Sequence, residues 1–407
     1  MQKQVFAGWC AAVSLSLVVA SGAAKAEQGY DVGVTDKEIK IGSFMPYSGP
    51  ASSYSVIGLT EAAYFRKIND EGGINGRKIN FISYDDAFSP PKTVEQARKL
   101  VESDEVFFLF NPLGTASNSA VQKYLNAKKV PQLLVGSGAT KWGDPKHFPW
   151  TMGWQPSYQS EARIYAKFIL DQHPNGKIAV IAINDDAGKD WVKGLRDGLG
   201  DKAAMIVAET KFESTDPTVD SQIVALKASG ADVFVGFLSP KTAAQAIRKV
   251  AEIGWKPTFI LNNPSTSVGA ILKPAGLENA RDIISTAYTK DPTDKIWSDD
   301  PGMKAWVAFM DSYMPEGDKT NANTVYGYSA AQLVVEILRR CGNDLTRTNL
   351  MKQAASLDHV KLDMLLPGIE VTTAPNDFYP IEQMQLMRFD GESWHTFGDV
   401  MQGEVGR

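Results

Sequence analysis

The regular alternation of short apolar runs with longer segments of helical periodicity restricts the fold of this chain more than any other feature. Each run has the length of a β-strand, and the segment after it carries apolar residues every three or four positions, as in an amphipathic helix. The runs lie at residues 39–44, 78–84, 106–110, 132–135, 177–183, 205–209, 233–237 and 259–261. Helices are predicted at 58–70, 89–103, 118–128, 160–172, 191–199, 219–229, 239–254, 303–314 and 324–340, before a strand-like tail from Pro367 with a turn at Gly391. This order predicts an α/β fold with parallel sheets covered by helices on both faces.

The length of the chain and an internal sequence similarity indicate two lobes. Without its first 26 residues the chain has about 380 residues, enough for two domains with sizeable cores. Lys78-Ile79 leads through a strand to Asp85-Asp86-Ala87, and Lys177-Ile178 leads through another to Asp185-Asp186-Ala187. Two copies of one strand–helix design predict two similar lobes, although any parallel strand can end in aspartate.

The first 26 residues have the pattern of an export signal. Lys3 precedes an apolar stretch from Phe6 to Ala20, and Ala24-Lys25-Ala26 places small residues where a signal peptidase cleaves. The stretch is shorter than the roughly 20 residues of a membrane helix. We therefore expect cleavage before Glu27 and a working form outside the cytoplasmic membrane, away from ATP and NAD. The alternative is an N-terminal anchor that stays uncleaved.

Charge and motifs exclude several classes of function. The formal net charge is −5, and loss of Lys3 and Lys25 makes it −7, a poor match to nucleic acid or an anionic membrane. The sequence has no H-E-x-x-H, G-x-S-x-G or Walker motif, and residues 136–141 begin like a dinucleotide-binding loop but end in lysine. The histidines lack metal-ligand spacing, and Cys341 would be alone once Cys10 is removed. We expect no enzyme activity, no catalytic residue, no metal and no cofactor, with Cys341 in the core.

Polar loops follow two of the predicted strands, at the edge where open α/β sheets bind ligands. Residues 111–117 and 136–140 each combine glycine, which lets a ligand approach the backbone, with hydroxyl side chains. The start of a helix after the first loop would present unpaired N–H groups, which suit a carboxylate. Together the loops predict a carboxylate site. The alternative is that both are ordinary turns.

A set of short motifs extends from these loops through the chain in a fixed order. They are Ser48-Gly49-Pro50 with Tyr54, Asp70-Glu71-Gly72-Gly73-Ile74-Asn75-Gly76, Tyr84-Asp85-Asp86, Val130-Pro131, Gly138-Ala139-Thr140, Gly188, Gly230-Ala231-Asp232 and Tyr328. On these motifs the chain resembles the periplasmic solute-binding proteins of ABC transporters, in the family typified by the leucine/isoleucine/valine-binding proteins. The resemblance covers essentially the whole chain after the export signal.

The resemblance implies a type I periplasmic binding fold, in which two Rossmann-like lobes joined by three crossovers close over a ligand. Crossovers near Trp154, Ser285 and Leu366 would give a signal peptide at 1–26, a first lobe at 27–154 plus 286–366 and a second lobe at 155–285 plus 367–407. By resemblance, the ligand's carboxylate is held by the two loops, and its body packs on aromatic rings. The residues implied are Gly114, Thr115, Gly138, Ala139 and Thr140 for the carboxylate, with Tyr54 and Trp154 beside the body.

Three second-lobe positions depart from the amino-acid-binding pattern. Ala187 and Leu238 stand where that pattern has tyrosines, and Asn263 stands where it has the acid that pairs with an α-ammonium group. An unpaired buried ammonium is costly, so we expect an aromatic or branched acid as ligand rather than an amino acid. Two alternatives remain: an alignment slip at Asn263, or a counter-charge supplied by Asp185, Asp186 or Glu161.

The leading hypothesis is the binding component of an importer of the branched-chain amino acid type. It would act as a periplasmic monomer, capture a small carboxylated solute by hinge closure and deliver it to a membrane permease. A sensor of the same fold that acts on a signalling partner is the second hypothesis, and a periplasmic hydrolase is the third.

Overall fold

A computed structural model describes residue 1 and residues 29–403 of the chain. The predicted cleavage site before Glu27 lies outside the described residues. In the part of the chain that is described, no helix is long and apolar enough to cross a membrane.

Two sheets form the framework, and the predicted α/β fold with parallel sheets is confirmed. The first has the strand order β2-β1-β3-β4-β5, and all its pairings are parallel. The second has the order β12-β11-β10-β9-β8-β6-β7, with β11 and β12 antiparallel to their neighbours. The strands are β1 (Glu38–Met45), β2 (Lys78–Asp85), β3 (Phe108–Phe110), β4 (Gln132–Val135), β5 (Thr151–Gly153), β6 (Ile178–Ile183), β7 (Ile206–Phe212), β8 (Val233–Phe237), β9 (Thr258–Leu261), β10 (Ile284–Ala287), β11 (Gln383–Phe389) and β12 (Trp394–Gln402).

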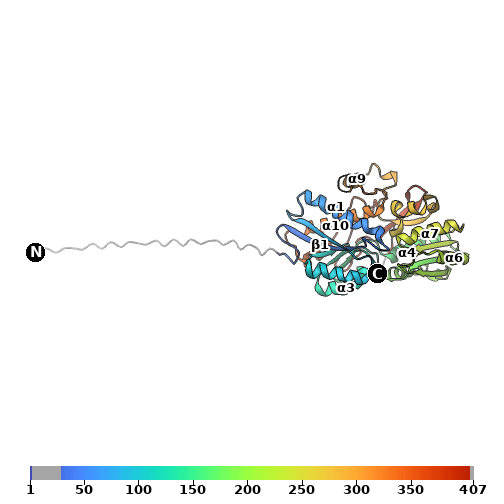
Figure 1. Ribbon diagram of the computed structural model, residues 1–407, viewed down its shortest axis with the longest axis horizontal. Coiled ribbons are helices and arrows are strands. Elements are labelled where there is room, and N and C mark those ends of the chain that lie inside the picture. The colour runs from blue at the N-terminus through green and yellow to red at the C-terminus, as the bar shows by residue number, and fades with distance from the viewer. Residues whose placement is uncertain (2–28, 404–407) are drawn as a thin grey trace.

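Helices cover both faces of the sheets and give the molecule two lobes side by side (Figure 1). We call the five-stranded sheet with α1–α3 and α9–α11 the first lobe, and the seven-stranded sheet with α4–α8 the second lobe. The helices are α1 (Ser55–Asp70), α2 (Pro90–Arg98), α3 (Thr115–Lys128), α4 (Tyr158–Gln172), α5 (Asp186–Leu199), α6 (Asp220–Ala228), α7 (Pro240–Glu252), α8 (Lys273–Ala275), α9 (Pro301–Tyr313), α10 (Ala322–Cys341) and α11 (Arg347–Ala354).

Apolar side chains on both faces of each sheet form the core. In the first lobe, the ring of Phe110 on β3 lies 5.5 Å from the ring of Phe65 on α1, whereas Phe44 belongs to a separate buried cluster with Leu125 of α3. All six residues of β6, Ile-Ala-Val-Ile-Ala-Ile, are buried, as expected of a central parallel strand. Cys341 is buried as predicted, and burial raises the pKa of its thiol to about 12.

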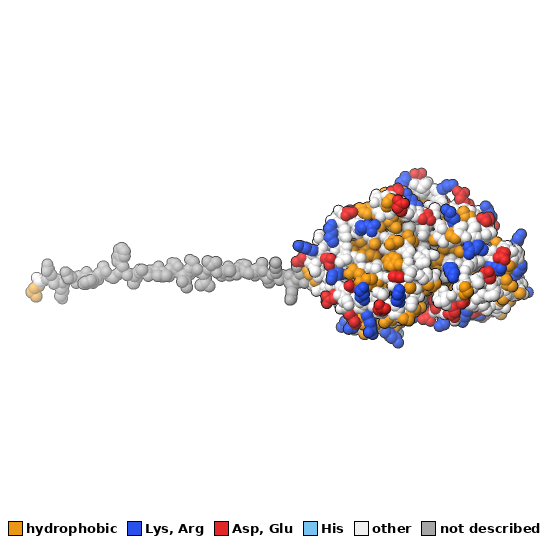
Figure 2. Space-filling model, in the orientation of Figure 1, with side chains coloured by type: hydrophobic (Ala, Val, Ile, Leu, Met, Phe, Trp, Pro, Cys, Tyr) orange, Lys and Arg blue, Asp and Glu red, His pale blue; other side chains and the backbone are white. Residues whose placement is uncertain are grey.

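Charged side chains of both signs are spread over the face in Figure 2, around a region where apolar side chains gather. Within the described part of the chain, no cluster of His, Cys, Asp and Glu side chains is arranged to hold a metal ion.

The chain passes between the two lobes more than once. Strands β6 to β10 belong to the second sheet, α9 and α10 pack on α1 of the first lobe, and β11 and β12 return to the second sheet. The predicted crossover near Ser285 falls inside β10, whose Ala287 still pairs with Gln385 of β11. The exact lobe boundaries stay a prediction.

Strands β5 and β10 and helix α11 were not predicted from the sequence. The sequence of β10 lacks an apolar pattern because its two middle residues, Ser285 and Thr286, are polar. Both are buried, and the hydroxyl of each lies 3.2 Å from the Tyr165 hydroxyl. Helices α3 and α5 begin at Thr115 and Asp186, earlier than the predicted starts at 118 and 191. Both earlier starts bring a helix N-terminus toward the space between the lobes.

Candidate functional site

A cavity of about 130 Å³ lies between the lobes. It is lined by the loops that follow β3 and β4 in the first lobe and by those that follow β6, β8 and β9 in the second, together with the first turn of α10. Parallel strands of an open sheet present their carboxyl ends to a ligand at this position.

Six of the ten predicted ligand-binding residues line this cavity. They are Tyr54, Gly114 and Thr115 from the first lobe, and Ala187, Leu238 and Asn263 from the second. The other four predicted residues, Gly138, Ala139, Thr140 and Trp154, are not among the residues that line it. Trp154 is fully buried, and its ring packs edge-on against the ring of Tyr326 at 6.4 Å between centroids.

The N-terminus of α3 faces the cavity with free donors. The first N–H groups of a helix have no partner within it, and Gly114 at the N-cap has no side chain to satisfy them. Gly114 has φ +100°, and a Cβ placed there would lie 2.6 Å from the ring of Phe88, so glycine is required on both counts. The result is a site for an anion at the cavity wall.

Hydrogen bonds behind Thr115 orient its hydroxyl as a donor. The Ser137 hydroxyl accepts from the backbone N–H of Ala139 at 3.2 Å and from Nε1–H of Trp142 at 2.9 Å. Its own proton is therefore donated to Oγ1 of Thr115, 2.7 Å away. Since Thr115 accepts this bond, its hydroxyl proton can be donated to the nearby Tyr158 hydroxyl or to a ligand. Ser137 is a supporting residue that the sequence analysis did not single out.

Asp185 is the only acidic or basic side chain among the described residues that line the cavity. Its Oδ1 caps α5 by accepting from the backbone N–H groups of Ala187 at 2.8 Å and Gly188 at 3.1 Å. Burial raises the pKa of Asp185, against the effect of these two hydrogen bonds. The carboxylate therefore has a structural role that occupies one of its oxygens.

Glu161 and Asn263 are joined by a hydrogen bond in the second lobe. Oε1 of Glu161 accepts from the backbone N–H of Asn263 at 2.6 Å and from the Tyr165 hydroxyl at 2.7 Å, and its Oε2 accepts from Nε1–H of Trp191 at 2.9 Å. Burial raises the pKa of Glu161. The Asn263 amide donates to the carbonyl of Thr286 at 2.6 Å. Glu161 is committed to these neighbours and does not line the cavity.

Aromatic rings form much of the remaining wall, and most were not predicted. Tyr158 and Trp191 stack at 3.7 Å between centroids and 27° between planes. Burial raises the pKa of Tyr158 to about 12, so this phenol is neutral at pH 7. The aromatic residues that line the cavity are Tyr54, Phe88, Tyr158, Trp191, Tyr288 and Tyr326. Trp191 and Tyr326 lie on amphipathic helices, where a single sequence does not distinguish a cavity wall from a core.

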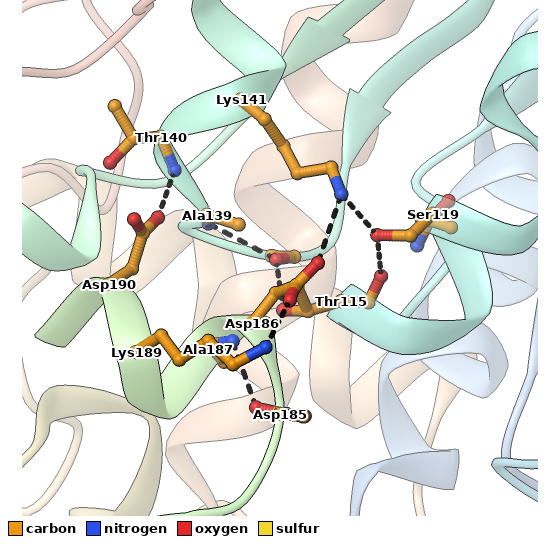
Figure 3. Close-up of polar contacts among 12 residues, drawn as sticks. Thr115, Ser119, Ala139, Thr140, Lys141, Asp185, Asp186, Ala187, Lys189 and Asp190 are labelled. Carbon is orange, nitrogen blue, oxygen red and sulfur yellow. Dashed lines mark hydrogen bonds and ion pairs between the residues drawn. The ribbon is translucent and has the colours of Figure 1, made fainter.

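The loop after β4 joins the two lobes, as Figure 3 shows. The backbone N–H of Thr140 donates to Oδ2 of Asp190 on α5 at 2.6 Å. Nζ of Lys141 lies 3.3 Å from Oδ2 of Asp186 on α5 and donates to the Ser119 hydroxyl on α3 at 2.8 Å. At the cavity, the Tyr54 hydroxyl donates to the carbonyl of Pro264 at 3.1 Å. The lobes are therefore closed on one another.

Comparison with known proteins identifies relatives over most of the chain. Residues 38–393 match the family described as periplasmic binding protein. A Leu/Ile/Val-binding protein homolog (homolog 7) of Brucella suis is 24% identical over 324 residues, which is 74% of this chain and 77% of the relative.

Two solved structures share the fold at low sequence identity. A branched chain amino acid ABC transporter protein from Thermus thermophilus with bound valine has a TM-score of 0.82 at 15% identity, covering 91% of this chain and 97% of its own. A solute binding protein of an ABC transporter from R. palustris, in complex with 4-hydroxybenzoate, has a TM-score of 0.75 at 16% identity, covering 90% and 97%. At these identities the likeness extends to the fold alone.

Proposed function

This chain belongs to the periplasmic binding protein family of ABC transporters, and from that premise we propose that it captures a small carboxylic acid between its lobes and delivers it to a membrane permease. The family implies a periplasmic location. Cleavage before Glu27 and a monomeric state are further parts of the proposal. No chemical step is involved, because the ligand stabilises the closed state by bridging the lobes.

The Thr115 hydroxyl beside the N-terminus of α3 is the observation that carries the carboxylate assignment. Ser137 donates to Thr115 rather than accepting from it, so the Thr115 proton is available to a ligand or to the neighbouring Tyr158 hydroxyl. The helix adds N–H groups and the positive end of its dipole. A carboxylate is held here by directed hydrogen bonds, without a lysine, arginine or histidine among the described residues of the cavity wall.

An acid without an ammonium group is the ligand we propose. Asn263 supplies no charge, Glu161 is engaged by three donors, and Asp186 is paired with Lys141 and Lys189 outside the cavity. Asp185 is the one acid left that could pair with an ammonium group from the cavity wall, but its side chain already caps α5. An aromatic or branched acid with its body on Tyr158 and Trp191 fits these features.

We expect benzoate- or cinnamate-type acids to bind at least about a hundredfold more tightly than leucine or valine. An ammonium would have only Asp185 as a partner, whose Oδ1 already caps α5, and a buried charge that is incompletely paired costs about 3 kcal/mol or more. Fluorescence titration measures this, because Trp191 lies in the cavity wall. Cinnamamide, which lacks the charge, is the matched control for the carboxylate. Submicromolar leucine or valine binding with inert aromatic acids would refute the ligand class and leave the transport role standing.

The contacts between the loop after β4 and α5 support closure as the mechanism. We expect Asp190→Ala to weaken the binding of every acid by the same factor, about tenfold, because it removes a charge-assisted bond that only the closed state makes. Lys141→Met should cost less than about fivefold, since its ion pair with Asp186 is solvent-exposed.

Calorimetry measures these losses of affinity, and small-angle scattering measures the fraction of molecules in the closed state. The control is Asp197→Ala, on the same helix, whose partners Lys193 and Arg163 are in the second lobe. A loss of affinity for Asp190→Ala that differs between ligands would mean that Asp190 acts on the ligand rather than on closure.

A further inference from the structure

Asn323 presents an unused donor to the cavity from the first turn of α10. The side chain lines the cavity, and the residue is only 8% exposed. Its Nδ2 is buried and has no hydrogen-bond partner among the described residues. Leaving a buried donor unpaired is costly, so such groups in native proteins call for a partner that arrives with a ligand or water.

The neighbours of Asn323 are already committed to one another. Oδ1 of Asn321 accepts from the Asn323 backbone N–H at 3.1 Å and from the Ser267 hydroxyl at 3.0 Å. The Ser267 hydroxyl in turn accepts from the backbone N–H of Ala322 at 3.2 Å. One turn along α10, the Tyr326 hydroxyl donates to Oε1 of Gln155 at 3.1 Å. These bonds fix the start of α10 against the second lobe and leave the Asn323 amide facing the cavity.

We propose that Asn323 forms a second subsite, which donates a hydrogen bond to a neutral oxygen of the ligand, such as a carbonyl, phenol or ether oxygen. This subsite rests on the proposed function, because it assumes that the carboxylate sits at Thr115. The two donors come from different helices, α3 and α10, and we assign them to two separate groups of one ligand.

The charge of the cavity wall determines the chemistry of the second group. Among the described residues, no lysine, arginine or histidine lines the cavity, and the only acidic side chain is that of Asp185. A second carboxylate would be buried beside a neutral amide without compensation, which is costly. A neutral oxygen acceptor needs only the hydrogen bond. The ligand class is therefore a monocarboxylate with one further oxygen on its body.

Matched pairs of substituted benzoates measure how much this oxygen contributes to binding. The probes are 3- and 4-methoxybenzoate and 3- and 4-acetylbenzoate, each compared with the methylbenzoate of the same position. We expect the wild-type protein to bind at least one oxygen-bearing probe about tenfold more tightly than its methyl counterpart. Asn323→Leu should bring that ratio close to one, because it removes the donor and keeps the volume. Thr115→Ala should weaken both members of a pair and leave the ratio unchanged.

The outcomes separate the second subsite from the proposed function. Wild-type ratios near one for all pairs, or a ratio that survives in Asn323→Leu, would overturn the subsite and leave the carboxylate site intact. A wild-type protein that binds none of the acids would overturn the proposed function together with the subsite. Melting temperatures within a few degrees of wild type show that the variants are folded, and Asn323→Asp, which keeps the size but removes the donor, repeats the test.

Discussion

Replacing Glu61 by glutamine is expected to stabilise the protein increasingly as the pH rises above about 4.5. Glu61 lies on the buried face of α1 with no exposed surface, and neither carboxyl oxygen has a hydrogen-bond partner among the described residues. Burial raises its pKa well above the ordinary 4.5. The folded protein therefore keeps the proton in a range of pH where the unfolded chain has lost it.

The sign of the pH dependence follows from this difference. Below pH 4.5 both states are protonated, and Glu61 costs nothing extra. Between 4.5 and the raised folded pKa, folding takes up a proton, so the free energy of unfolding falls by up to about 1.4 kcal/mol per pH unit. Glutamine has the same shape and does not titrate, so the variant lacks this loss.

Denaturant titrations of wild type and Glu61→Gln between pH 4 and 8 measure the effect. The control is Glu95→Gln on α2, where the side chain is exposed and the two curves should stay parallel. A difference between wild type and Glu61→Gln that does not change with pH would mean that Glu61 titrates in the folded state as it does in the unfolded chain.

Replacing Thr115 by valine is expected to weaken the binding of aromatic acids by about ten- to a hundredfold. The substitution keeps the side-chain shape and removes the hydroxyl that Ser137 orients toward the cavity. A hydrogen bond to a charged group contributes roughly 1.5–3 kcal/mol. Calorimetry with cinnamate measures the loss. Cinnamamide should lose much less, since the bond to its carbonyl is not charge-assisted.

Thr140→Val is the matched control for that experiment. The sequence pattern places Thr140 with the carboxylate, but in the structure its side chain does not line the cavity, and its Oγ1 has no partner among the described residues. Only its backbone groups contact Asp190 and Tyr379, and valine retains them. We expect its affinity to stay within about twofold of wild type. Equal losses for both variants would extend the carboxylate site to the loop after β4.

The fold was largely predictable from the sequence because parallel strands buried on both faces read as apolar runs. β4 occupies the predicted range, and β6 differs from it by one residue. Strand β10 was missed because its middle residues are polar and satisfy Tyr165 inside the core. Its place in the sheet depends on that distant tyrosine, which local periodicity does not contain.

The candidate site was predictable only where it lies on loops at strand ends. Gly114 and Thr115 were found because glycine and a hydroxyl follow an apolar strand. Thr140 was placed there too, but the chain turns into a 3₁₀ helix at this residue and presents its backbone to α5. Asn323 and Tyr326 were missed, because their helix reads as an ordinary buried helix. Asparagine one turn before a tyrosine, at the start of that helix, is the pattern that marks them.

The return of the chain to the first lobe has a consequence for how the two lobes fold. In the first lobe, the Arg66 side chain bonds to the carbonyl of Tyr313 across 247 residues, and Arg347 bonds to the carbonyl of Phe107 across 240. In the second lobe, the ring of Phe168 on α4 lies 6.2 Å from the ring of Phe397 on β12, across 229 residues. Folding slows as the mean sequence separation of native contacts grows. Each lobe is therefore completed only after a late segment of the chain has joined it, α9 to α11 in the first lobe and β11 with β12 in the second.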